Sequence, residues 1–96
     1  MLTIEEIRAA VRKVGKKYGI KNAYLFGSYA KGEATEDSDV DILIDRGDIH
    51  TYRDYSRFWD ELEEELGKGV DISSEDGMYP KIFELVKNSR VLLYEA

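Results

Sequence analysis

Cysteine is absent from the 96 residues, and this absence excludes both a disulfide framework and a metal site built from thiolates. No apolar run approaches the roughly 20 residues that a membrane-spanning helix needs. The first six residues also lack the basic start and the apolar run of a secretory signal peptide. We therefore expect a protein of the cytoplasm that makes no contact with a membrane.

Basic residues are scarce in the middle of the chain. Residues 32–76 hold four Lys or Arg against sixteen Asp or Glu, whereas residues 1–31 hold seven against two. Binding to nucleic acid needs a basic surface that follows the phosphate backbone, so we expect no direct nucleic-acid partner. The acidic middle segment instead suits a metal site or a basic protein partner.

The pattern of apolar residues predicts an α/β (α+β) fold. A chain of 96 residues can bury one modest core, and we expect residues 1–96 to form a single domain. Helical spacing indicates two long helices, which end at Gly19 and Gly67, and two shorter ones near 28–31 and after Pro80. Short apolar segments indicate strands at 23–26, 40–44, 70–72 and 91–94. This order predicts a small mixed sheet of about four strands flanked by helices.

The second long helix carries a stripe of aromatic and aliphatic residues. Its members recur at helical spacing, and we expect them to face the core: Tyr52, Tyr55, Trp59, Leu62 and Leu66. His50, the only histidine, lies in the polar connection before this helix, where we expect it on the surface.

Two carboxylates stand at positions i and i+2 of a predicted strand. Successive strand side chains alternate between the two faces, so Asp39 and Asp41 point the same way while Val40 points into the core. Like charges side by side repel each other unless a cation lies between them, and Mg²⁺ prefers carboxylate oxygens. An ordinary solvent-facing strand would show the same alternation. Asp71 adds a third carboxylate in another short apolar segment.

A turn suited to phosphate precedes the carboxylates by ten residues. Gly27 follows a predicted strand, and glycine lets the backbone approach a ligand closely. We expect Ser28 at the N-cap of the next helix, where free N–H groups and the helix dipole attract phosphate, although serine is a common cap without any ligand. Lys31 is either a further phosphate contact on the same helix face or an ordinary exposed lysine.

Residues 26–44 resemble the signature of the DNA polymerase β-like nucleotidyltransferase superfamily. In this run Gly27 and Ser28 are followed, after ten residues, by the pair Asp39 and Asp41. It is similar in particular to the minimal nucleotidyltransferase (MNT) family, and this resemblance extends over nearly the whole chain. The resemblance implies that Gly27 and Ser28 hold the triphosphate of a nucleotide. It also implies that Asp39 and Asp41 bind two Mg²⁺ ions, and that Asp71 completes one metal site nearest the attacking hydroxyl. Two such metals, roughly 3.5–4 Å apart, clamp the attacking and leaving oxygens at phosphorus.

The MNT resemblance also implies an activity and a partner. In HEPN–MNT toxin–antitoxin pairs, the MNT protein is an antitoxin that transfers AMP from ATP to a tyrosine of a HEPN ribonuclease toxin. We expect this activity, and with it a hetero-oligomer, because a chain of this length leaves little room for an acceptor pocket of its own. Two alternatives stay open: an interaction module that neutralises its partner by binding alone, and a nucleotidyltransferase that modifies a small-molecule hydroxyl.

Overall fold

Helices and strands alternate along the chain in the order that the sequence predicts. The computed structural model describes residues 1–96, the side chain of Val86 excepted. The helices are α1 (Ile4–Tyr18), α2 (Gly27–Lys31), α3 (Tyr52–Leu66) and α4 (Pro80–Val86), with short 3₁₀ turns η1 (Glu75–Gly77) and η2 (Lys87–Ser89) on either side of α4. The strands are β1 (Asn22–Phe26), β2 (Val40–Asp45), β3 (Val70–Ser74) and β4 (Val91–Glu95). The predicted α+β fold with four strands is confirmed.

The four strands form one mixed sheet in the order β3-β2-β1-β4. Strand β1 runs antiparallel to both β2 and β4, whereas β2 and β3 are parallel, with α3 as the connection between them. The register places Asp41 beside Phe26 on one side and beside Asp71 on the other. Two of the three predicted carboxylates therefore start from neighbouring positions on adjacent strands.

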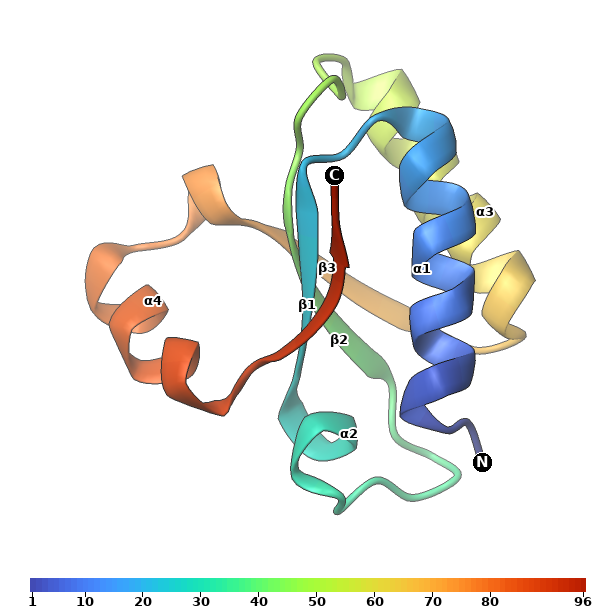
Figure 1. Ribbon diagram of the computed structural model, residues 1–96, viewed down its shortest axis with the longest axis vertical. Coiled ribbons are helices and arrows are strands. Elements are labelled where there is room, and N and C mark those ends of the chain that lie inside the picture. Colours follow the sequence, from blue (N-terminus) through green and yellow to red (C-terminus); the bar gives the residue numbers. More distant parts are fainter.

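Different helices lie on the two faces of the sheet. Helices α1 and α3 lie together on one face, and α4 lies on the other side of the sheet, with α2 at the end of β1 (Figure 1). We call the face covered by α1 and α3 the core face. The opposite face, which carries Tyr24, Phe26, Asp41 and Asp71, is the site face, because residues paired across neighbouring strands share a face.

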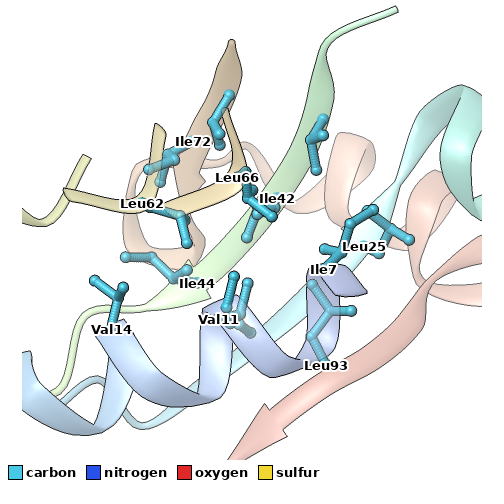
Figure 2. Close-up of a cluster of buried hydrophobic side chains, with 14 of the residues drawn as sticks. Ile7, Val11, Val14, Leu25, Ile42, Ile44, Leu62, Leu66, Ile72 and Leu93 are labelled. Atoms are coloured by element: carbon cyan, nitrogen blue, oxygen red, sulfur yellow. The ribbon is translucent and has the colours of Figure 1, made fainter. Parts of the chain in front are cut away.

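The core lies between the sheet and the two long helices. Figure 2 shows side chains of α1 and α3 meeting those of the strands, and the buried cluster includes Ile7, Val11, Leu25, Ile42, Ile44, Leu62 and Leu93. Helix α1 begins with a complete capping box, in which the Thr3 hydroxyl accepts from the Glu6 N–H and the Glu6 carboxylate accepts from the Thr3 N–H. No described helix is long and apolar enough to cross a membrane.

The predicted core stripe of α3 is wrong at its first turn. Tyr52 is 90% exposed, and Tyr55 and Trp59 are only half-buried. The fully buried aromatic residue is Phe58, whose ring packs edge-on against Tyr18 of α1 with 5.8 Å between centroids. The contact with α1 therefore turns α3 so that Phe58, rather than the aromatic stripe, enters the core together with the predicted Leu62 and Leu66.

Candidate active site

The chain turns sharply between β1 and α2. Helix α2 begins directly after Phe26, and Gly27 has a φ of +65°, which is accessible to glycine and strained for other residues. Phe26 is the N-cap and makes no capping hydrogen bond from its side chain, so the prediction that Ser28 is the N-cap is wrong. The N-cap therefore lies two residues before Ser28, and Gly27 with its positive φ makes the turn from β1 into α2. Ser28 lies in the first turn, where backbone N–H groups have no partner within the helix.

The glycine of this turn lies directly against one of the carboxylates. A Cβ atom on Gly27 would lie only 2.2 Å from Oδ2 of Asp41, so no side chain fits between them. The β1–β2 register produces this contact, since Phe26 pairs with Asp41 and Gly27 is the next residue. The fold thus brings together two features that lie fourteen positions apart in the sequence, the turn at Gly27 and the carboxylate of Asp41.

The carboxylate of Asp41 has two other carboxylates near it, those of Asp39 and Asp71. Burial raises the pKa of Asp41 above its usual 3.8, and the negative charges of Asp71 and Asp39 raise it further. Asp41 is half-buried, whereas Asp39 and Asp71 are exposed. Asp39 lies just before β2, where its Oδ1 would be 2.8 Å from a Cβ on Gly69. The mutual repulsion is the kind that a bound cation would relieve.

The chemistry of this group suits Mg²⁺, which prefers carboxylate oxygens. Asp41 and Asp71 start from paired positions on parallel strands, so their backbones lie about 5 Å apart. Among the described residues, however, no group of three or more His, Cys, Asp or Glu side chains is placed to hold a metal ion. The donor types and backbone positions therefore fit Mg²⁺, and the exposed side chains of Asp39 and Asp71 would have to rotate to surround an ion together with Asp41.

Lys31 ends α2, one turn beyond Ser28. Its side chain is exposed, and it forms no ion pair with a described side chain. The structure leaves it free to turn toward the start of α2 or into solvent. Its place at the phosphate therefore stays a prediction.

Comparison with known proteins assigns the chain to a family. The sequence model of the nucleotidyltransferase domain family matches residues 4–94 of this chain. The chain belongs to the nucleotidyltransferase domain family. This nucleotidyltransferase domain is 38% identical over 90 residues to a Methanocaldococcus jannaschii protein with the provisional name protein adenylyltransferase MJ0435, over 94% of this chain and 97% of that one. It is 40% identical over 76 residues to the protein adenylyltransferase MntA of Thermococcus cleftensis, over 75% and 77% of the two chains.

Solved structures show the same fold. A provisionally identified minimal nucleotidyltransferase superposes with a TM-score of 0.81 at 36% identity, covering 94% of this chain and 95% of the other. An MNT antitoxin in complex with a tri-AMPylated HEPN toxin from Shewanella oneidensis superposes with a TM-score of 0.72, covering 98% of this chain and 74% of that one. At 18% identity the second likeness shows the fold alone. The predicted relation to minimal nucleotidyltransferases is confirmed.

Another cluster of polar groups in this nucleotidyltransferase domain lies away from the carboxylates of Asp39 and Asp41. A cavity of about 390 Å³ opens where β2 and β3 end, and its lining includes Arg46, His50, Glu75 and Asp76. Asp39 and Asp41 lie at the opposite end of β2, where this strand begins. His50 is exposed on the rim of a cavity that includes none of the predicted site residues, which agrees with its predicted surface position.

One basic residue near the site escaped the sequence prediction. Arg90 lies directly before β4, and its guanidinium stacks on Tyr24 of the site face, with 4.1 Å from Cζ to the ring centroid. The signal in the sequence was a lone arginine at the start of the last apolar segment. The sequence does not show that Arg90 lies near the site, because this follows from the pairing of β4 with β1, the strand that leads into Gly27.

Proposed function

We propose that this chain transfers AMP from ATP to a hydroxyl group of a protein partner. The observation that supports the proposal is the contact between the backbone of Gly27 and the carboxylate of Asp41, which puts the start of α2 beside a half-buried acidic side chain. Gly27 and Ser28 bind the triphosphate, with Lys31 as a further contact. Asp39, Asp41 and Asp71 would hold two Mg²⁺ ions.

The reaction is a displacement at the α-phosphorus of ATP. The acceptor oxygen forms the new bond to phosphorus, the bond to the β-phosphate oxygen breaks, and pyrophosphate leaves. Mg²⁺ supplies neutralisation of the phosphate charge when it is bound. Asp71 is exposed on β3, the edge strand beside β2, and in this proposal it accepts the proton of the incoming hydroxyl. Gly27 and Ser28 hold the leaving phosphates in line through their backbone N–H groups.

We propose that the acceptor is a tyrosine of a HEPN ribonuclease toxin, which makes this chain the antitoxin of the pair. Two relatives carry the name protein adenylyltransferase, and a structural neighbour is an MNT antitoxin bound to an AMPylated HEPN toxin. The acidic segment 32–76 favours a basic partner. In this proposal residues 1–96 act as one domain, in the cytoplasm, where ATP is available.

The test is AMP transfer to the product of the neighbouring gene, which this proposal expects to be a HEPN protein. Both proteins are incubated with ATP and Mg²⁺, the partner is weighed by intact mass spectrometry, and peptide mapping locates the modified residue. We expect the added mass of AMP on a tyrosine, and none with the double variant Asp39→Asn/Asp41→Asn. Asp60→Asn, an exposed aspartate of α3, is the matched control and should leave the transfer unchanged. Unmodified partner, or equal modification by the double variant, would refute the proposal.

A second candidate, neutralisation by binding alone, is favoured by one observation: the described carboxylates are not placed to hold a metal ion. The two candidates differ in what the double aspartate variant does to the toxin. If the variant adds no AMP yet inhibits the ribonuclease as fully as the parent chain, binding alone is sufficient. If the ribonuclease stays active with the variant and is silenced by the parent chain, the transfer itself is the function.

A further inference from the structure

Arg90 belongs to a row of residues that crosses the sheet at the level of the catalytic carboxylates. Asp41 pairs with Phe26 on β1, and the next pair on the far side of β1 joins Leu25 to Val91. Continuing that antiparallel register by one residue puts Arg90 beside Phe26. Since neighbouring strands lie about 4.8 Å apart, the backbones of Arg90 and Asp41 are about 10 Å apart, with the Gly27 turn at the end of the strand between them.

The guanidinium of Arg90 is held over the site face by aromatic rings. Its Cζ lies 4.1 Å from the ring centroid of Tyr24 and 5.7 Å from that of Phe83. Stacking of this kind orients the planar group without using its N–H donors. Arg90 forms no ion pair with a described side chain, although its charge opposes the rise in the pKa of Glu75 that burial causes. Glu75 lies toward the end of the sheet away from Asp41, so the Arg90 side chain has to turn back along β1 to reach the Gly27 turn. Its hydrogen-bonding capacity is therefore available to a ligand.

We propose that Arg90 holds the β- and γ-phosphates of the nucleotide, and so the pyrophosphate that leaves. This inference rests on the proposed function. In the proposed function, Asp39, Asp41 and Asp71 on the acidic side of the row would hold the metal ions, and the Gly27 turn would receive the phosphates. Arg90 supplies the positive charge on the other side of that turn. A guanidinium suits this task because its fork of donors matches two phosphate oxygens, and its side chain can turn from the Tyr24 ring while the backbone stays in place.

A purely structural role for Arg90 predicts a different result. If the residue only ties the segment around α4 to the sheet through Tyr24 and Phe83, its loss disturbs the site as a whole. Binding of every adenine nucleotide would then weaken to the same extent. A phosphate ligand instead discriminates by phosphate number, because AMP has no β- or γ-phosphate for Arg90 to hold.

The experiment measures binding of AMP-PNP, ADP and AMP to the whole chain by calorimetry, with Mg²⁺ present. For Arg90→Ala we expect affinity for AMP-PNP to fall roughly 10- to 100-fold, the range for a lost hydrogen bond to a charged group, while AMP affinity stays nearly constant. Arg90→Lys should recover part of the loss, because it restores the charge without the fork. Arg53→Ala, on the exposed surface of α3, is the matched control and should bind like the parent chain.

Each outcome decides between defined alternatives. Equal weakening of AMP-PNP and AMP, or unchanged AMP-PNP binding by Arg90→Ala, overturns the assignment of Arg90 while the proposed function stands. Failure of the parent chain to bind AMP-PNP refutes the proposed function and this assignment with it. Circular dichroism and urea unfolding check that the variants are folded. If Arg90→Ala is not folded, Arg90→Gln, which keeps most of the stem, takes its place in the same comparison.

Discussion

A methyl group at position 27 would collide with the carboxylate of Asp41. In Gly27→Ala, the new Cβ would lie 2.2 Å from Oδ2 and 3.2 Å from Cγ of Asp41. The nearest atom is the end of a flexible side chain, so the carboxylate would rotate away and leave the backbone in place. Alanine at a φ of +65° also costs about 1–2 kcal/mol in the free energy of unfolding, because its Cβ crowds the following carbonyl.

Gly32→Ala separates these two effects. Gly32 has a φ of +73°, and a Cβ there would meet nothing within 4 Å. Both variants should therefore lose a similar 1–2 kcal/mol or so of stability in urea unfolding. Only Gly27→Ala should lose catalysis, by about 100-fold or more, since a displacement of about 1 Å in a reacting group costs that much.

The assay is the initial rate of AMP transfer to the partner at saturating ATP, with urea unfolding of the same samples. Gly32→Ala should keep a rate close to that of the parent chain. A Gly27→Ala variant that transfers AMP as fast as Gly32→Ala would refute the reasoning, because it would show that the position of the Asp41 carboxylate against the turn is unimportant. Equal and large rate losses in both variants would place the effect in the backbone of α2 instead of in the carboxylate contact.

Three further variants test the electrostatics and the packing. The pKa of Asp41 is raised above 3.8, so the folded state binds this proton more tightly than the unfolded state does. The free energy of unfolding therefore falls as the pH rises above 3.8. Asp41→Asn should abolish this fall and should be more stable than the parent chain at pH 7, as measured by urea unfolding with a chelator present. Phe58→Ala should lower the free energy of unfolding by about 3–5 kcal/mol, whereas Tyr52→Ala should change it by less than about 0.5 kcal/mol. Thr3→Ala removes one half of the capping box and should cost about 1 kcal/mol, seen as a lower urea midpoint. Results of opposite sign or order would contradict these assignments.

The sequence predicted the helices and strands well where short-range rules decide. Glycines ended α1 and α3 at the expected residues, since a left-handed residue at the end of a helix needs no tertiary contact. The alternation around Val40 was also right, because strand geometry puts every second side chain on one face. The pairing of Asp41 with Asp71, by contrast, depends on β2 and β3 being parallel neighbours, which spacing alone does not fix.

The errors arose where tertiary packing chooses between two similar patterns. In α3, a stripe through Tyr55 and one through Phe58 both fit helical spacing and share Leu62 and Leu66. The packing of α3 against α1, including the contact of Phe58 with Tyr18, buries Phe58 and leaves Tyr55 half-exposed. Arg90 was overlooked for a related reason, since its closeness to the site follows from the position of β4 beside β1.

Gly69 gives the carboxylate group a second constraint, which differs in kind from that at Gly27. Its φ lies outside the left-handed region, so the backbone there would accept any L-residue, yet a Cβ would lie 2.8 Å from Oδ1 of Asp39. The backbone therefore tolerates a side chain at this position, and what such a side chain would displace is the exposed carboxylate of Asp39. Among chains of this fold, those that keep transfer activity should retain glycine here, whereas those that have become binding proteins are free to acquire a side chain.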